Sequence, residues 1–159
     1  MIRDLLSRDH ERLDVLLACT LREDGFLDQQ AYGEFRQGLL RHIGIEERVL
    51  FPALRNGARF ADVERRLHRD HAALAALLVP PPTRKEIEAI RMILADHNGV
   101  EEARGGVYDA VDELSNAESI AEAVVSFPAV ALAPHSDTPL LRTTIERLLR
   151  ERTTDDVSR

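Results

Sequence analysis

Apolar side chains recur at the spacing of an α-helix over most of the first 115 residues of this 159-residue chain. The pattern predicts four amphipathic helices, at about residues 2–21, 28–54, 60–79 and 84–114. The connections between them are short, so neighbouring helices should run antiparallel. We therefore predict an all-α fold in which residues 1–115 form an up-down-up-down four-helix bundle.

Residues that start or stop helices stand at the predicted boundaries. Asp28 and Thr83 precede the second and fourth helices as N-caps. Pro52 is expected to kink or tighten the end of the second helix, because proline lacks the N–H that a helix needs. The breaks between helices are predicted at Gly25, at the RNG tripeptide 55–57 and at the prolines 80–82.

Residues 116–159 are predicted to form a C-terminal extension with one or two short helices. The segment 118–133 is rich in alanine and valine, and Thr138 and Pro139 then open an amphipathic helix to about residue 152. The apolar side chains of 118–152 either cap the end of the bundle or form a contact with a second copy or another protein. The sequence leaves both alternatives open for Val124, Val125, Phe127, Val130 and Leu132.

Charge and cysteine content restrict the class of protein. A formal net charge of −7 argues against broad nucleic-acid binding and weakly against anionic membranes. No apolar run approaches the ~18 residues of a membrane helix, and no signal pattern is apparent, so a reducing cytoplasm is the expected location. The single cysteine, Cys19, excludes an intramolecular disulfide and a cysteine-rich metal site, and is expected to be buried on the first helix.

Two motifs occur twice. The stretch DHERLDVLL from Asp9 returns as DHAALAALL from Asp70, with the aspartate, the histidine and three leucines in common. HIGIEE from His42 returns as HNGVEE from His97, so both copies read H-x-G-x-E-E. The chain is thus predicted to contain two helical hairpins, each with a histidine on its first helix and an H-x-x-x-E pair on its second.

The histidines of both motifs lie on the apolar stripes of their helices. Positions i and i+4 are about 40° apart on a helix, so each H-x-x-x-E pair turns an imidazole and a carboxylate into the core. Two buried carboxylates are costly unless cations offset their charge. Six nitrogen and oxygen ligands are too many for one tetrahedral zinc, and they suit two ions of iron, manganese or zinc. The predicted ligands are His10, His42, Glu46, His71, His97 and Glu101.

Each part of this pattern has an ordinary structural alternative. A lone H-x-x-x-E is often a surface pair, a lone core histidine is often only hydrogen-bonded, and a repeat can persist for packing alone. The conjunction of four inward histidines, one on each helix, favours metal. His68, about 60° from His71 on the helical wheel, is either an additional ligand or a rim residue, and His135 lies outside the bundle.

Other side chains adjoin the predicted ligands. Asp14 is expected to face inward, either to orient an imidazole or to accept a hydrogen bond from an arginine. Tyr108 either hydrogen-bonds to a ligand or fills the core. Gly105 and Gly106, in the predicted fourth helix, indicate a kink, close packing or an opening for a small molecule. Three carboxylates are expected to face outward: Glu11, Glu47 and Glu102.

The arrangement resembles the hemerythrin-like HHE cation-binding domain over about residues 1–115. The six predicted ligands and the EERVLFPAL continuation of the second helix carry the resemblance, which implies a four-helix bundle around an oxo- or hydroxo-bridged di-iron centre. Oxygen-carrying members have H-x-x-x-H on the third helix, where Ala75 and Leu67 here cannot bind metal. They also have an aspartate at i+5, where this chain has Glu101 at i+4. The chain is therefore more similar to the bacterial, non-carrier branch.

The resemblance implies two iron ions as cofactor, with manganese or zinc as substitutes, and dioxygen, nitric oxide or peroxide as small ligand. We expect a module that binds or senses dioxygen, nitric oxide or iron. One alternative is an enzyme, either a di-iron catalase or peroxidase or one that removes nitric oxide, and another is a structural bundle with incidental metal. The binding module is our first hypothesis. An enzyme would in addition need a proton donor near the open site, and the only candidates are Tyr108 and a protonated carboxylate.

Overall fold

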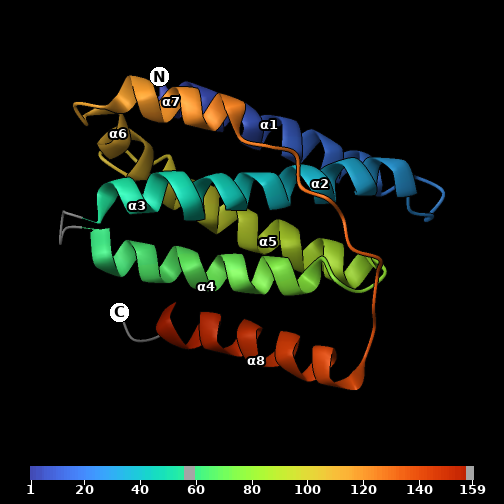
Figure 1. Cartoon of the computed structure of the whole chain (residues 1–159). Helices are drawn as coiled ribbons and strands as arrows, with labels where there is room; N and C mark the ends of the chain where they lie inside the picture. The colour runs from blue at the N-terminus through green and yellow to red at the C-terminus, as the bar shows by residue number, and fades with distance from the viewer. Residues whose placement is uncertain (56–59, 157–159) are drawn as a thin grey trace.

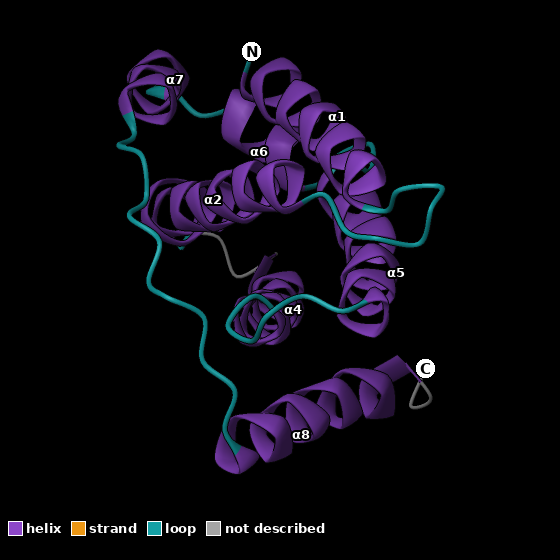
Figure 2. Ribbon diagram, turned by 90° about the vertical axis from the view of Figure 1, so that its right-hand side faces the viewer, coloured by secondary structure: helices purple, strands orange, loops and turns teal. Residues whose placement is uncertain are grey.

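The computed structural model describes residues 1–55 and 60–156, and the regular structure in these ranges is helical. Figure 1 shows the long helices of the bundle side by side with alternating direction, and Figure 2 shows them around one common core. The predicted all-α bundle is therefore confirmed. The elements are α1 (Ile2–Thr20), α2 (Gln29–Ile45), the π-helical segment η1 (Glu46–Leu50), α3 (Phe51–Leu54), α4 (Ala61–Leu77), α5 (Arg84–Glu101), α6 (Val107–Asp112), α7 (Ala117–Ser126) and α8 (Pro139–Asp156).

Local chemistry sets the starts of α2 and α5. The carboxylate of Asp28 accepts a hydrogen bond of 2.9 Å from the backbone N–H of Ala31. Thr83 and Glu86 form a reciprocal capping box at the start of α5. Both predicted N-caps are confirmed.

The second helix changes its hydrogen-bond register at the first H-x-G-x-E-E motif. From Glu46 to Leu50 the backbone is π-helical, and the N–H of Phe51 donates to the carbonyl of Glu46. Pro52 follows in the first turn of α3. Because proline has no N–H and crowds the carbonyl four residues earlier, the widened turn before Pro52 relieves this conflict. The predicted helix end at 55–57 falls mostly outside the described residues.

The last long helix of the bundle is shorter than the apolar pattern indicated. α5 ends at Glu101 and α6 begins after a turn, so the prediction of one continuous helix to residue 114 is wrong. Gly105 in this turn has φ +71°, a left-handed conformation that commonly ends helices. A Cβ atom on Gly106 would lie only 2.7 Å from the carbonyl oxygen of Ala103 and 2.8 Å from that of Glu101. The two glycines therefore form a tightly packed turn rather than a stretch of helix.

The apolar core consists of two clusters at opposite ends of the bundle. One includes Leu13 and Leu17 of α1 and Phe35 of α2. The other includes Ile2 and Leu6 of α1 and several residues of α3 and α6. Since His10 lies between these positions on α1, the polar residues of the repeated motifs occupy the level between the two clusters.

The extension packs on the outside of the bundle. α7 contributes Ile120 and Val124 to the cluster that contains Ile2 and Leu6. Residues 127–138, which we call the strap, then cross to α8 without regular structure (Figure 1). Side chains of α2 donate hydrogen bonds to carbonyl groups in and just before the strap. α8 lies mainly against α4 (Figure 2), and its arginines also pair with carboxylates of α5.

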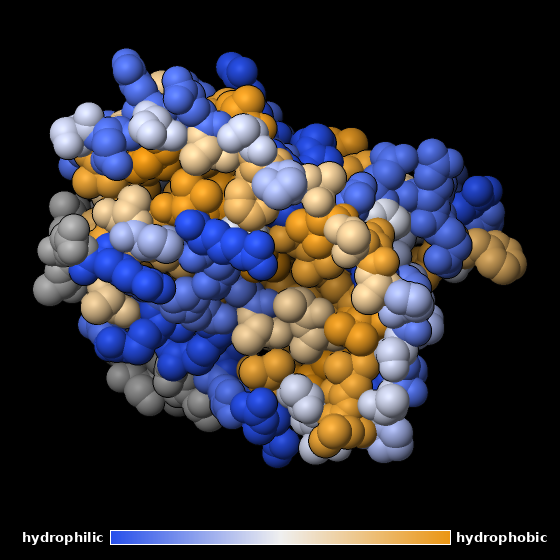
Figure 3. Space-filling view, viewed as in Figure 1, coloured by the Kyte–Doolittle hydropathy of each residue, from blue (hydrophilic) through white to orange (hydrophobic). Residues whose placement is uncertain are grey.

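Some apolar side chains of the extension remain at the surface. Val125 is 67% exposed, Leu132 is 37% exposed and Leu140 is 77% exposed. Figure 3 shows apolar residues gathered on the face that the strap crosses. A contact of this face with a second copy or with another protein stays a prediction.

Two surface properties bear on the sequence predictions. Cys19 is exposed, so the expectation that it is buried is wrong. Leu17 and Thr20 take the inward positions of the last turn of α1 in its place. Among the described residues, the helices are too short or too polar to cross a membrane.

Candidate metal centre

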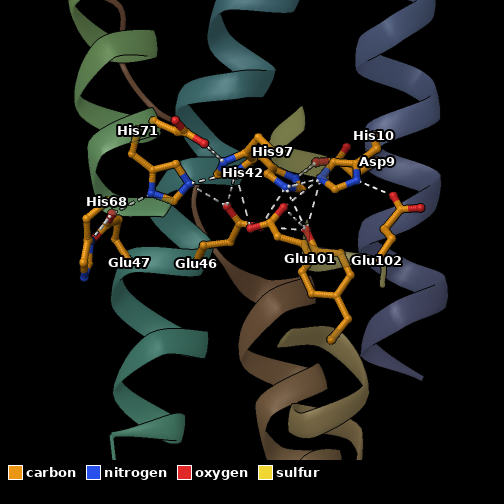
Figure 4. A network of polar contacts seen from close by, with 12 residues as sticks. Asp9, His10, His42, Glu46, Glu47, His68, His71, His97, Glu101 and Glu102 are labelled. Carbon is orange, nitrogen blue, oxygen red and sulfur yellow. Dashed lines mark hydrogen bonds and ion pairs between the residues drawn. The ribbon is translucent and has the colours of Figure 1, made fainter. Parts of the chain in front are cut away.

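A layer of buried polar side chains separates the two apolar clusters. No imidazole of this layer is more than 5% exposed, and its two carboxylates are 0% exposed. Figure 4 shows the side chains turned toward one another from the surrounding helices. The structure thus brings together all six predicted ligands, which are His10 from α1, His42 from α2, Glu46 from η1, His71 from α4, and His97 and Glu101 from α5.

Each of the two carboxylates faces both hairpins. One oxygen of Glu46 lies 3.0 Å from Nε2 of His42, and the other lies 3.0 Å from Nε2 of His71. Glu101 repeats this arrangement toward the remaining two histidines, at 3.5 and 3.3 Å. Both carboxylates are therefore placed to bridge the two halves of the layer.

The imidazoles form two close pairs. The Nε2 atoms are 2.9 Å apart in one pair and 3.2 Å apart in the other. Together with the bridging carboxylates they make two groups of donor atoms that lie within 4.8 Å of one another. The first cluster consists of His10, His42, Glu46 and Glu101, and the second cluster of Glu46, His71, His97 and Glu101.

The outer nitrogens of two imidazoles are bonded to the aspartates of the D-H motifs. Nδ1 of His42 lies 2.9 Å from the carboxylate of Asp9, and Nδ1 of His97 lies 3.3 Å from that of Asp70. In both cases the aspartate comes from the first helix of the same hairpin. Because an ionised carboxylate only accepts, Nδ1 carries the proton in each pair.

The other two imidazoles are bonded to the second glutamates of the E-E pairs. Nδ1 of His10 lies 2.5 Å from Glu102, and Nδ1 of His71 lies 2.6 Å from Glu47. Here the carboxylate reaches across to the opposite hairpin. The expectation that Glu47 and Glu102 face outward is therefore wrong, because a position one residue beyond an inward glutamate is turned about 100° toward the neighbouring helix.

The two repeated motifs thus encode ligands together with the carboxylates that orient them. An imidazole whose Nδ1–H is held by a carboxylate presents the lone pair of Nε2 in a fixed direction. No orienting role was predicted for Asp9 and Asp70 from the sequence. The signal that could have found all four outer carboxylates is the doubling itself, because both copies keep D-H and E-E as adjacent pairs.

Asp14 does not take the predicted place beside the ligands. Its side chain is exposed, as is that of Glu11. The buried stripe of α1 is centred between Leu13 and His10, which leaves Asp14 about 70° from the middle of the stripe. The orienting role predicted for Asp14 belongs instead to Asp9.

Neither of the remaining histidines belongs to the first or second cluster. His68 lies 2.7 Å from Glu47 and 3.2 Å from Glu64, on the outer side of His71. It joins Glu47 and His71 in a third, half-buried group of close donor atoms at the rim. His135 lies outside the bundle, where its Nδ1 is 3.1 Å from a backbone carbonyl.

The hydroxyl of Tyr108 lies within hydrogen-bond distance of both buried glutamates. It is 2.7 Å from Glu46, 3.0 Å from Glu101 and 3.1 Å from Nε2 of His10. Burial, and then the charges of the two glutamates, raise the pKa of Tyr108 well above its ordinary value, so the phenol keeps its proton. The turn after α5 makes the contacts of Tyr108 possible, because it changes the direction of the chain before α6, the helix that carries Tyr108.

The donor set fits a pair of cations. With Nδ1–H bonded outward, the lone pairs of neighbouring Nε2 atoms face each other at 2.9 and 3.2 Å, a repulsive arrangement unless a proton or a metal ion lies between them. One oxygen of Glu46 and one of Glu101 accept no hydrogen bond from the described residues. Six carboxylates surround the four imidazoles, and Arg12 and Arg152 each pair with one of them. The remaining formal charge of −4 equals the charge of two divalent ions in magnitude.

Without metal, protons must offset the buried carboxylates. Burial alone would lower the pKa of His42, but Glu46 and Asp9 outweigh it and raise that pKa to about 10. The pKa of His97 is raised well above its ordinary value despite burial, chiefly by the charge of Glu101. Burial, and then the charge of Glu46, raise the pKa of Glu101 itself. The metal-free layer therefore holds additional protons at neutral pH.

We expect the metal-free chain to lose stability as the pH rises. The folded-state pKa of His42 is about 10, above its ordinary value of 6.5, so its contribution to the free energy of unfolding is fully present below about pH 6.5 and is lost toward pH 10. Thermal unfolding of chelator-treated protein across this range measures the effect. Metal affinity should show the opposite trend, because ligands must give up protons to bind an ion. A melting temperature of the metal-free chain that rises with pH would contradict the prediction.

Comparison with known proteins places this layer in a family. Searches of curated proteins and of solved structures found no match. The family model of the hemerythrin HHE cation binding domain matches residues 1–105, a span that contains both clusters and all four outer carboxylates. The match covers more than half of the chain, and it agrees with the resemblance drawn from the repeated motifs. The chain therefore belongs to the hemerythrin HHE cation-binding family.

Proposed function

We propose that this chain holds two iron ions, one in each cluster, and binds dioxygen, nitric oxide or peroxide at them. The observation that supports this most directly is the two-sided placement of Glu46 and Glu101, each with oxygens toward both clusters. A carboxylate that bridges two ions needs this placement. A single ion would leave one imidazole pair and two carboxylate oxygens without a counter-charge.

The donor types favour iron. Each cluster offers two imidazole nitrogens and two carboxylate oxygens, and it contains no thiolate. Four such ligands would saturate a tetrahedral structural zinc, whereas non-haem iron keeps open positions beside histidine and carboxylate ligands. Manganese and zinc accept the same donors and are the expected substitutes. Membership of a cation-binding family supports the presence of a metal ion at these residues.

The surroundings of the centre suit a small ligand. Two ferrous ions, when bound, would supply open coordination positions and electrons. Apolar clusters above and below the layer restrict water, while a cleft of about 510 Å³ between α1 and α5 reaches His10. Asn98 and Glu102 also line this cleft. We propose that small molecules approach the first cluster along it.

A second candidate function is the turnover of peroxide by an enzyme. It is favoured by Tyr108, whose hydroxyl donates to Glu46 at 2.7 Å and retains its proton. Peroxide cleavage requires a positioned proton donor, although the raised pKa of Tyr108 makes this phenol a weak acid. The same hydroxyl would also stabilise the bridging carboxylates in a protein that only binds its ligand, so ligand binding stays the first candidate.

The test is elemental analysis of the purified, untagged chain with an absorption spectrum of the same sample. We expect about two irons per chain and near-ultraviolet charge-transfer bands from ligands to iron. Dioxygen, nitric oxide and peroxide are then added in turn. Stable spectral changes support binding, whereas continued peroxide consumption that Tyr108→Phe abolishes supports the enzyme. Zinc alone, or no metal after anaerobic ferrous loading, would overturn the proposal.

A further inference from the structure

The two halves of the centre differ in how their aspartates are held. In the first hairpin, Asp9 receives a second hydrogen bond from Arg12, whose Nε lies 2.9 Å from the carboxylate, one turn further along the same helix. The position that corresponds to Arg12 in the second repeat is Ala73, which is buried. The second D-H motif therefore lacks the arginine that its own helix would supply.

α8 supplies that arginine from outside the bundle. Nε of Arg152 lies 2.7 Å from Oδ1 of Asp70, and a second guanidinium nitrogen lies 3.1 Å from Asp96. Asp70 is 1% exposed, and the side chain of Arg152 is 14% exposed. The other oxygen of Asp70 faces Nδ1 of His97. An unbroken series of contacts thus leads from α8 to an imidazole of the second cluster.

This series fixes the direction in which the imidazole presents its lone pair. A buried carboxylate with only one partner can rotate, and rotation would release the N–H that it holds. The guanidinium holds one oxygen of Asp70 and leaves the other directed at His97. Hydrogen-bond partners of metal ligands commonly contribute 10- to 100-fold to metal affinity.

We propose that Arg152 is a positioning residue of the second cluster and that docking of α8 completes this half of the centre. The inference rests on the proposed two-ion function. Arg152 lies beyond the residues matched by the family model, so it is a feature of this chain's own extension. The first cluster is independent of α8, because α1 carries Arg12 itself.

α8 has further attachments to the bundle, so loss of Arg152 should not release it. Arg142 pairs with Glu86 at 2.5 Å, close to the start of the helix. Ile145 is 7% exposed, and Leu141, Leu148 and Leu149 pack against the same apolar cluster. The effect of Arg152 on metal can therefore be separated from the effect of undocking.

The experiment is an anaerobic titration of the full chain with ferrous iron against a competing chelator, with bound iron measured directly. The unaltered chain should bind two ions. Arg152→Gln should bind the ion of the first cluster with unchanged affinity. It should bind the ion of the second cluster roughly 10- to 100-fold more weakly. Arg152→Lys restores the charge and should recover part of the loss. Arg147→Gln is the matched control, since Arg147 lies on α8 and pairs with Glu151 of the same helix.

Two further variants locate the effect. If Arg152 acts through its partner, the double variant Asp70→Asn with Arg152→Gln should bind iron no more weakly than Asp70→Asn alone. Arg142→Gln removes the ion pair that joins the start of α8 to Glu86 and should leave both affinities unchanged. Weakening of the second ion by Arg142→Gln equal to that by Arg152→Gln would overturn the positioning role, because loosening of α8 would then explain both.

The outcome separates this inference from the function on which it rests. Two ions on the unaltered chain with the same two affinities in Arg152→Gln would overturn only the positioning role. Fewer than two ions on the unaltered chain would overturn the proposed function and the inference with it. Circular dichroism of every variant checks that helix content is retained.

Discussion

Replacement of Glu46 by glutamine is expected to empty both clusters of metal. Glu46 is 0% exposed, and its two oxygens lie 3.0 Å from His42 in one cluster and 3.0 Å from His71 in the other. The amide has nearly the same shape but no charge, so the substitution removes a shared ligand while the bundle stays packed. The loss of affinity should exceed the roughly 10- to 100-fold typical of outer hydrogen-bond partners. Bound iron per chain, measured after equilibration with a weak chelator, reports the result.

The neighbouring glutamate provides the matched control. Glu47 holds the outer nitrogen of His71 and belongs to neither the first nor the second cluster. Glu47→Gln should therefore weaken one ion and leave the other bound. Retention of both ions by Glu46→Gln, or equal losses in the two variants, would show that Glu46 does not bridge.

Replacement of Gly106 by alanine is expected to destabilise the chain and to displace Tyr108. The added Cβ would lie 2.7–2.9 Å from three backbone carbonyl oxygens, and these cannot move without unwinding the end of α5. Overpacking of this kind costs about 1–3 kcal/mol. Since Tyr108 follows within the next turn, its hydrogen bonds to Glu46 and Glu101 should lengthen or break. Thermal unfolding measures the first effect, and the spectrum of the iron-loaded chain the second.

Gly99 is the control for this substitution. It lies on α5, and nothing lies within 4 Å of the position of an added Cβ atom. Because alanine is the better helix former, Gly99→Ala should be neutral or stabilising by up to about 1 kcal/mol. Similar melting temperatures for Gly106→Ala and the unaltered chain would mean that the turn adapts without moving Tyr108.

Both predictions follow from the position of the polar layer. Apolar clusters close the bundle above and below it, and the carboxylates of Glu46 and Glu101 cannot reach bulk water. A buried carboxylate is tolerated only with a counter-charge, which comes from protons when the chain is free of metal and from cations when it is loaded. The layer therefore couples metal content to stability and to pH.

The bundle and the six inward-facing histidines and glutamates can be predicted from consecutive residues alone. Helix periodicity, N-caps such as Asp28 and the H-x-x-x-E spacing are properties of a single helix, so they can be derived from consecutive residues. A histidine on an apolar stripe faces the core whatever the neighbouring helix is. The prediction that these donors bind two ions follows from their number and type, and it awaits measurement.

The contacts that side chains make between helices depend on how the helices pack. Glu47 and Glu102 lie off the apolar stripes of their own helices. Their roles depend on the opposite hairpin, which brings an imidazole nitrogen to 2.6 Å from Glu47 and to 2.5 Å from Glu102. Arg152 meets Asp70 across 82 positions of sequence, through a strap whose path no helical period describes. The physical reason is the same for each: a helical wheel gives the direction of a side chain, but the group it meets depends on how separate helices pack.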